Sequence, residues 1–300
     1  MNMLRLNHIS KRFGNHEIIK DLNLHVKEHS IYGFLGQNGA GKTTTMKMIL
    51  GLYPADSGEI SVYDTPVTYG ENQTSRYIGY LPDVPEFYGF MTPAEYLTLC
   101  ADIVCMSDTD KAKQIPELLE LVGLSGADKR IHGFSRGMKQ RLGIAQALLG
   151  TPKLLICDEP TSALDPVGRK EILDILHTVK EKTTIIFSTH ILSDAERICD
   201  EIGVLHDGRL ACSGTMDELL GHHPDNGFFI EFGTPSDLEK FCTFYPGGSR
   251  TGKMTLQYPG GENRDLLAAL SLLTRHSIVP KRIEQCEPSL EALFMEVIDK

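Results

Sequence analysis

The segment Gly36-Gln37-Asn38-Gly39-Ala40-Gly41-Lys42-Thr43 decides how this chain folds and what it binds. Glycines at these spacings let backbone N–H groups curl around a phosphate, while a lysine reaches the outer phosphates and a hydroxyl holds magnesium. An apolar stretch, Ile31–Leu35, precedes the segment, and residues 44–50 have the pattern of a helix that ends at Gly51. A strand, a phosphate loop and a helix N-terminus in this order predict a site for a nucleoside triphosphate.

The bulk composition is that of a globular chain. Its 300 residues are 41% hydrophobic, enough for one large domain and a smaller one. Lys+Arg 30 against Asp+Glu 40 gives a net charge of −10, which argues against nucleic acid as a partner. The seven cysteines are scattered without a CxxC pair, as is typical of reduced thiols rather than a zinc or redox centre.

A membrane-spanning helix needs roughly 18 consecutive apolar residues, and no stretch of the sequence approaches that length. The N-terminus also lacks the apolar block of a secretory signal. We therefore expect a cytoplasmic chain that reaches a membrane only when another polypeptide recruits it.

The hydrophobic pattern predicts an α/β fold class: a P-loop NTPase core with an N-terminal antiparallel sheet, a helical subdomain and a small α+β C-terminal appendage. Alternation near residues 4–8 and 22–26 indicates the antiparallel strands. Residues from about 85 to 148 have mostly helical spacing, with a capping box at Thr92-Pro93-Ala94-Glu95. Apolar strands at 154–157 and 184–187 flank a helix whose apolar face includes Val167, which predicts parallel strands.

The C-terminal part of the chain reads as a separate small domain. Residues 222–226 lack apolar periodicity and form the expected linker between a domain at 1–221 and a domain at 227–300. Strand-like stretches at 228–232, 254–258 and 278–283 alternate with helical runs, one of which has a capping-box pattern at Ser236 and Glu239. The sequence leaves the role of this domain open.

Two carboxylates, Asp158 and Glu159, follow the apolar strand at 154–157. In a P-loop ATPase this position lies at the sheet edge beside the phosphate loop. Asp158 is then expected to bind Mg²⁺ through its water shell while Thr43 supplies a hydroxyl ligand. Glu159 can accept a proton from the attacking water without binding the metal.

The segment Phe134-Ser135-Arg136-Gly137-Met138-Lys139-Gln140 resembles the signature sequence of ATP-binding cassette (ABC) transporters, with Arg136 where the family usually has glycine. Ser135 is a good N-cap, and its hydroxyl and the backbone N–H of Gly137 can form a second anion site. Together with the phosphate loop and the paired carboxylates, this segment makes residues 1 to about 220 similar to the ATP-binding subunit of such transporters. Residues 288–294 resemble the tail of the exporter-type subgroup.

The resemblance implies an ATPase that powers transport, with export expected, through separate integral membrane permease subunits. It also implies a dimer with a second ATP-binding subunit, most simply a homodimer, which holds two ATP molecules, each with Mg²⁺, between the subunits. Such a dimer is cytoplasmic and peripheral, on the inner face of the cell membrane. The loop Ser162-Ala163-Leu164-Asp165 resembles the one that connects the two sites across the dimer interface.

The site residues that the resemblance implies fall into three groups. Lys42, Glu159 and His190 are catalytic, with His190 contacting the γ-phosphate and fixing the attacking water. Thr43, Asp158 and Asp83 are the metal candidates. The nucleotide contacts are Phe13, Gly36, Gln37, Asn38, Gly39, Ala40, Gly41, Lys42, Thr43, Thr44, Ser135 and Gly137.

Three alternatives stay open. Phe13 is either the aromatic residue that stacks on adenine or an ordinary core phenylalanine. Asp83 stands where the family usually has glutamine, and an ionised aspartate accepts hydrogen bonds but cannot donate them. The same cassette also serves soluble ATP-driven clamps on nucleic acid and regulatory modules that bind ATP without transport, although the acidic charge and the presence of Glu159 and His190 argue against these.

Overall fold

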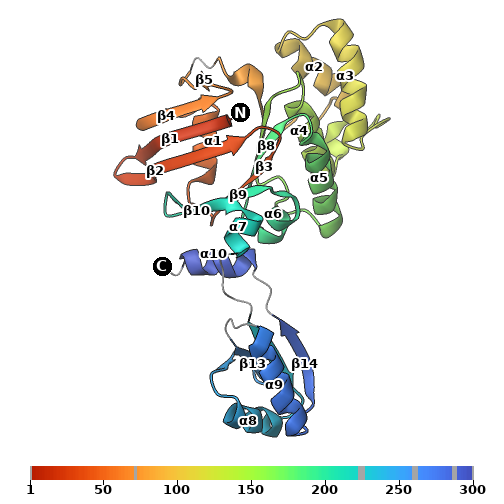
Figure 1. The fold of residues 1–300 in the computed structure, drawn as a ribbon. Helices are drawn as coiled ribbons and strands as arrows, with labels where there is room; N and C mark the ends of the chain where they lie inside the picture. Colours follow the sequence, from red (N-terminus) through yellow and green to blue (C-terminus); the bar gives the residue numbers. More distant parts are fainter. Residues whose placement is uncertain (1, 71–72, 222–226, 259–262, 286–288, 299–300) are drawn as a thin grey trace. The chain divides into compact units, whose positions relative to one another are not determined.

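The computed structural model describes residues 2–70, 73–221, 227–258, 263–285 and 289–298 (Figure 1). The chain divides into two compact units, Met1–Thr215 and Met216–Lys300. This division falls before helix α7 (Met216–Gly221), whereas the sequence suggested a boundary after it. The expected linker at 222–226 lies outside the described residues. Within the described ranges, we find no helix that is both long and apolar enough to cross a lipid bilayer.

The first unit is built on a six-stranded sheet in which neighbouring strands are parallel except at one edge. The antiparallel pair, β9 and β10, is joined by a turn at Asp207 and Gly208, where the sequence predicts a hairpin. Because the other strands are parallel, the loops after β3, β6, β7 and β8 all emerge at the same edge. The strand order is β10 (Arg209–Thr215), β9 (Glu201–His206), β3 (Ile31–Leu35), β8 (Thr184–Thr189), β7 (Leu154–Asp158) and β6 (Ile78–Leu81).

A second sheet is antiparallel, and two of its strands precede the phosphate loop in sequence while the other two follow it. It confirms the expected N-terminal sheet. Helix α1 (Lys42–Ile49) packs against this sheet, because its Met46 and Met48 belong to the same apolar cluster as the sheet's buried side chains. Figure 1 shows this sheet beside the parallel one, on the side opposite α5 (Pro166–Val179). Its strand order is β2 (His16–Lys27), β1 (Asn2–Phe13), β4 (Ser57–Val62) and β5 (Thr65–Pro66).

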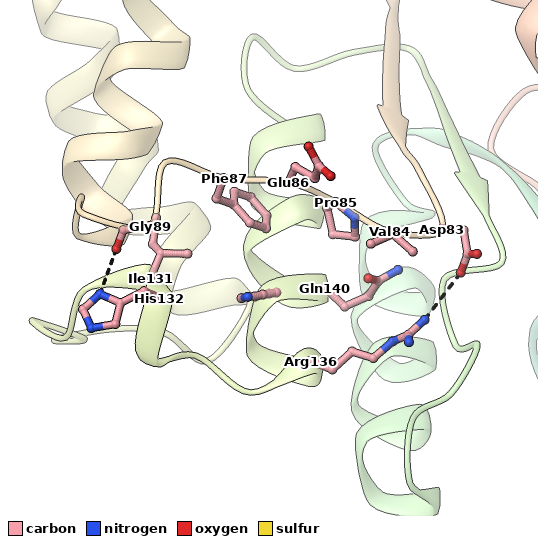
Figure 2. A pocket seen from close by; sticks show the side chains of 11 residues that line it. Asp83, Val84, Pro85, Glu86, Phe87, Gly89, Ile131, His132, Arg136 and Gln140 are labelled. Atoms are coloured by element: carbon pink, nitrogen blue, oxygen red, sulfur yellow. Dashed lines mark hydrogen bonds and ion pairs between the residues drawn. The ribbon is translucent and has the colours of Figure 1, made fainter.

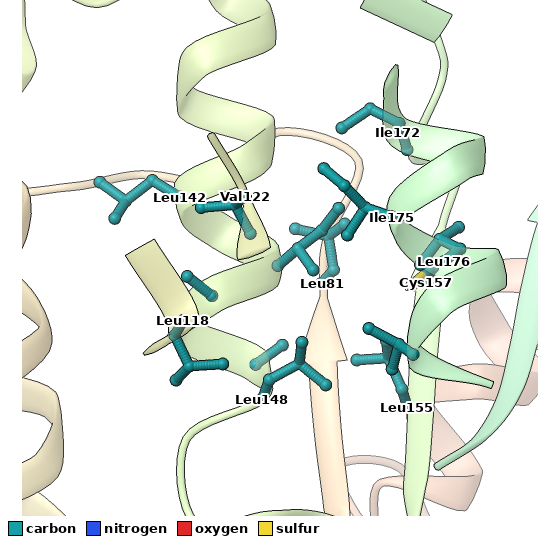
Figure 3. Packing of buried hydrophobic residues seen from close by; sticks show 14 of the residues in the cluster. Leu81, Leu118, Val122, Leu142, Leu148, Leu155, Cys157, Ile172, Ile175 and Leu176 are labelled. Atoms are coloured by element: carbon teal, nitrogen blue, oxygen red, sulfur yellow. The ribbon is translucent and has the colours of Figure 1, made fainter. Parts of the chain in front are cut away.

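The parallel sheet is buried on both faces, and strand β7 shows how the sequence achieves this. Leu154 and Ile156 belong to the cluster with α1 and the antiparallel sheet, whereas Leu155 and Cys157 belong to the cluster with the helices of the other face (Figure 3). Alternate side chains of a strand point to opposite faces, so a continuous apolar run is required here. Each fully buried aliphatic side chain contributes about 1.5–3 kcal/mol through its removal from water.

Helices α2 (Pro93–Ile103), α3 (Asp108–Leu121) and α4 (Arg136–Ala147) follow β6. The capping box is confirmed, since Thr92 Oγ1 accepts from the Glu95 N–H at 3.3 Å and Glu95 Oε2 accepts from the Thr92 N–H at 2.8 Å. The helices lie within the range from about 85 to 148 that the sequence predicts as mostly helical, but the first of them begins only at Pro93, because residues 82–92 form no regular structure. Prolines at 82 and 85 disfavour helical backbone in this stretch.

Strand β6 packs tightly against α4 at Gly79, where a Cβ atom would lie 2.0 Å from the backbone oxygen of Ala147. A side chain at this position would push the two elements apart, so glycine is required by the close approach. This contact holds α4 beside the end of β6. It therefore fixes the position of the loop that carries Asp83.

Two helical details differ from the sequence-based expectation. Val167 is 66% exposed, because it lies in the first turn of α5 before the buried face begins at Ile172. The helix expected to be capped by Ser236 starts earlier: Thr234 is the N-cap of α8 (Pro235–Phe244), and its Oγ1 accepts from the Asp237 N–H at 3.2 Å. Pro235 occupies the first helical position, which proline favours.

The second unit contains a four-stranded antiparallel sheet with two helices in the order strand, helix, strand, strand, helix, strand. The strand order β12-β13-β11-β14 makes this the split βαβ arrangement. Phe232 and Phe241 pack at its centre. Its remaining elements are β11 (Phe228–Phe232), β12 (Ser249–Arg250), β13 (Thr255–Tyr258), α9 (Asn263–Arg275), β14 (Pro280–Gln285) and α10 (Leu290–Ile298).

Candidate functional site

The phosphate loop joins β3 to α1 with a backbone that requires glycine at two points. Gly39 and Gly41 have φ angles of 87° and 108°, a region that other residues rarely adopt. Gly41 is also the N-cap of α1, and no side chain caps this helix end. The first turn of α1 therefore presents its dipole to the loop, as anion-binding helices do.

Lys42 is buried at the base of this loop. Its ammonium group donates to the backbone oxygen of Gly36 at 2.7 Å and to that of Gln37 at 3.3 Å. Its Nζ also lies 3.2 Å from Glu159 Oε1. The loop carbonyls and Glu159 thus hold the lysine where the phosphate loop turns.

Asp158 is buried at the end of β7 and is held by two hydroxyl groups. Thr43 Oγ1 donates to its Oδ2 at 2.8 Å, and Ser188 Oγ donates to its Oδ1 at 2.7 Å. Ser188 was not among the residues expected from the sequence. Only the parallel register, which pairs Asp158 with Ser188 on β8, brings that hydroxyl to the site.

Glu159 adopts a left-handed backbone, with φ of 49°, directly after β7. Its N–H donates to the backbone oxygen of Ser188 at 3.1 Å and to the Oγ at 3.0 Å, so β8 also fixes this turn. Glu159 Oε2 lies 2.8 Å from Nδ1 of His190, which follows β8. Glu159 Oε1 is buried and makes no hydrogen bond within the described residues, although it faces Lys42.

These groups surround a cavity of about 540 Å³. Ile18, which the sequence did not suggest, also lines it. His190 contacts this lining through Glu159, whereas Gly36 and Ala40 lie in the loop without lining the cavity. The expected residues that line it are Phe13, Gln37, Asn38, Gly39, Gly41, Lys42, Thr43, Thr44, Asp83, Asp158 and Glu159.

Phe13 is not a core residue. Its side chain is 46% exposed at the cavity mouth, and its ring meets the edge of Tyr53 with centroids 5.6 Å apart. A half-exposed ring at the mouth of a cavity offers a flat surface on which a planar base can stack.

The signature segment lies apart from this cavity in the same chain. Ser135 is the N-cap of α4, and its Oγ accepts from the Met138 N–H at 3.2 Å. Neither Ser135 nor Gly137 lines the cavity. The two expected nucleotide contacts of this segment are therefore not brought to the phosphate loop within one chain.

Asp83, which follows β6, contacts two other segments. Ser162 Oγ donates to its Oδ1 at 2.8 Å, and Nη2 of Arg136 lies 3.7 Å from the same oxygen. Burial, and then the carboxylates of Asp158 and Asp83, raises the pKa of Tyr80 on β6 to about 12. Tyr80 thus stays protonated beside two acidic groups at neutral pH.

A second cavity, of about 450 Å³, opens on the other side of Asp83; we call it the groove (Figure 2). Residues 83–87 and Gly89, the pair Ile131 and His132, and the first turns of α4 line it, and Figure 2 shows Arg136 and Asp83 pointing toward each other at one end. Val84 lines the groove, and three large apolar side chains of this loop, Val84, Tyr88 and Phe90, are more than half exposed. Singly exposed apolar groups are ordinary, but several in one loop are typical of an interaction surface.

Comparison with known sequences gives a consistent result. The family described as "ABC transporter" matches residues 19–162. The uncharacterised ABC transporter ATP-binding protein YxlF of Bacillus subtilis is 40% identical over 301 residues, 99% of each chain. The bacitracin transport ATP-binding protein BcrA of Enterococcus faecalis is 40% identical over 99% of this chain and 96% of its own. The linearmycin resistance ATP-binding protein LnrL of Bacillus subtilis is 36% identical over 98% of each chain.

Solved structures resemble this one over most of the chain. An ATP-binding subunit of an ABC transporter has a TM-score of 0.66 and 34% identity, covering 72% of this chain and 91% of its own. A dimeric ATP-binding cassette in a post-hydrolysis state, bound to ADP and Pi, has a TM-score of 0.64 and 26% identity, covering 71% of this chain and 99% of its own.

Proposed function

The chain belongs to the ABC transporter family as an ATP-binding and ATP-hydrolysing subunit, and we propose that two copies of it close around two ATP molecules to drive separate permease subunits. One observation carries the proposal: the phosphate loop and the two carboxylates at the end of β7 line a single cavity, and the histidine after β8 contacts one of these carboxylates. The clamp alternative has no observation in its favour, since YxlF and BcrA are named as ABC transporter and bacitracin transport ATP-binding proteins.

Hydrolysis in this proposal depends on positioning and electrostatics. Lys42 offsets charge on the outer phosphates, and Glu159 accepts a proton from the attacking water. His190 holds Glu159 through the 2.8 Å contact between its Nδ1 and Glu159 Oε2.

The residues beside the phosphate loop fit Mg²⁺. The Thr43 hydroxyl and the Asp158 carboxylate are oxygen donors 2.8 Å apart, and Mg²⁺ prefers oxygen donors. In the described parts of the chain there is no cluster of three or more His, Cys, Asp and Glu side chains able to hold a metal by itself. When bound, the ion supplies positive charge to the phosphates.

The position of the signature segment supports the proposed dimer. Ser135 and Gly137 lie away from the cavity of their own chain, so we propose that they complete the site of a second copy. The test is size-exclusion chromatography of the full chain carrying Glu159→Gln, which blocks water attack. We expect a dimer with ATP and Mg²⁺ and a monomer without nucleotide; a monomer under both conditions argues against the proposal.

The groove is the proposed docking site for a permease segment, because the exposed Val84 lines it and the exposed aromatic side chains of Tyr88 and Phe90 lie in the same loop. Tyr88→Ser is expected to reduce co-isolation with an integral membrane protein. Tyr69→Ser is the matched control, because Tyr69 is similarly exposed, at 61% against 57% for Tyr88, and lies outside the loop of residues 82–92 that borders the groove. Equal loss with both variants, or co-isolation with ribosomes or DNA instead, contradicts this assignment.

Export is the proposed direction. Two of the relatives are named for bacitracin transport and linearmycin resistance, and both match this chain almost end to end. Reconstitution of the complex in vesicles with ATP supplied on the cassette side tests the direction, since export moves the transported compound away from that side.

A further inference from the structure

Three segments that are far apart in the sequence meet at Asp83. Ser162 Oγ donates to Asp83 Oδ1 at 2.8 Å, while Nη2 of Arg136 donates to Ser162 Oγ at 3.4 Å and lies 3.7 Å from Asp83 Oδ1. The serine hydroxyl therefore accepts from one partner and donates to the other. We call these three side chains the clasp.

The clasp lies between the two cavities. Asp83 lines both the nucleotide cavity and the groove, and Arg136 lines the groove (Figure 2). Ser162 is tied to the catalytic turn, because its N–H donates to the backbone oxygen of Glu159 at 3.0 Å. A continuous series of contacts therefore runs from Arg136 and Asp83 through Ser162 to Glu159.

The two charged residues of the clasp, Arg136 and Asp83, have complementary charges. The Arg136 guanidinium has only hydrogen-bond donors and a carboxylate such as that of Asp83 has only acceptors, so the two groups are complementary. The glycine and glutamine that the resembling family usually has at these two positions could not form this ion pair. Both side chains are about half exposed, at 47% and 46%. Exposed ion pairs contribute little to stability, so this one can open and close without unfolding the unit.

We infer that Arg136 and Asp83 are positioning residues, which hold the loop after β6 against the start of α4 and, through Ser162, set the turn that carries Glu159. The inference rests on the proposed function of the site and names two residues that position its catalytic glutamate. In this inference the Asp83 carboxylate binds Arg136 and Ser162 and is not a ligand of the metal.

A double-mutant cycle on the purified full chain tests the clasp. We expect Arg136→Ala and Asp83→Ala each to lower kcat about fivefold with KM for ATP changed less than about twofold, because a positioning pair affects turnover more than binding. The double variant is expected to be no slower than either single one. Effects that multiply to about 25-fold show independent roles and overturn the inference. Arg136→Lys keeps the charge and should retain most of the turnover.

The matched control is Arg197 with Asp174, an ion pair of 2.9 Å and similar exposure that joins α6 (Leu192–Ile198) to α5. Its alanine variants should leave kcat unchanged. Hydrogen exchange supplies a readout that needs no turnover: Arg136→Ala should speed exchange in residues 82–92, whereas Arg197→Ala should not. Unchanged exchange in that segment overturns the clasp, while a wild-type chain without ATP turnover speaks against the proposed function instead.

Discussion

Lys42 Nζ and Glu159 Oε1 lie 3.2 Å apart, and both side chains are largely buried. The other oxygen of Glu159 is engaged by His190, so a single carboxylate connects the phosphate-loop lysine to the loop after β8. A phosphate that approaches Lys42 must compete with Glu159 for the same positive charge. Charges in a partly buried site interact more strongly than in water, so this competition affects binding as well as chemistry.

Glu159→Gln should separate the two effects. The amide is neutral and no longer competes for Lys42, so ATP should bind at least as tightly as to the wild type. Turnover should fall by about 10²–10⁴-fold, because the group that accepts the proton is lost. Equilibrium binding of a fluorescent ATP analogue and a phosphate-release assay measure the two quantities.

Glu171→Gln is the control for this substitution, because Glu171 of α5 pairs with Arg141 of α4 and does not line the cavity. It should change neither quantity. Unchanged turnover in Glu159→Gln removes Glu159 from its role as base.

His190→Ala should lower kcat by about 10²-fold and leave KM for ATP nearly unchanged, because the imidazole orients Glu159 and does not line the cavity. Steady-state ATPase kinetics give both values. His177→Ala, an exposed position on α5, is the control and should behave as the wild type. A large rise in KM with little change in kcat contradicts the orienting role.

The phosphate loop and the strands around it could be predicted because their signals are local. Strand β3 starts and ends where the sequence indicated, since a short apolar run before a glycine-rich loop leaves few alternatives. The capping box at Thr92 was equally readable, because both partners lie within one helical turn. In each case, residues that are close together in the sequence were enough to predict the local structure.

Contacts that depend on register were beyond the sequence. Ser188 reaches Asp158 only because β7 and β8 are paired in one particular register. The clasp needs three loops to converge, and neither Arg136 nor Ser162 carries a local signal for Asp83. The strand order of the second unit likewise arises from packing rather than from its alternating pattern.

Thr43→Ala should raise the Mg²⁺ concentration needed for half-maximal ATPase activity, because one oxygen donor is lost. Thr43→Ser keeps the hydroxyl and should need about as much Mg²⁺ as the wild type. A Mg²⁺ titration at saturating ATP distinguishes them. Equal Mg²⁺ requirements in the alanine and serine variants contradict a metal role for Thr43, since its bond to Asp158 would then serve only to hold the loop.

Asp56→Asn tests an electrostatic contact of the antiparallel sheet that lies outside the active site. The Asp56 carboxylate accepts from the buried Lys11 Nζ at 2.8 Å and from the Arg12 N–H at 2.7 Å. The hydrogen bond from Lys11, followed by that from Arg12, lowers the pKa of Asp56 below its ordinary value of 3.8. A lowered folded-state pKa contributes stability that is fully present above the unfolded-state pKa and is lost as pH falls through the folded-state value.

At pH 7 Asp56→Asn should therefore lower the free energy of unfolding by about 0.5–1 kcal/mol, with the half exposure of Asp56 keeping the effect small. Urea denaturation should show this difference shrinking as pH falls below about 4, because the wild-type carboxylate then becomes protonated and loses its advantage over the amide. Asp128→Asn, at an exposed position, should show no such dependence. A difference that stays constant down to the lowest pH at which the chain folds means that the shape of the side chain, rather than its charge, stabilises the sheet.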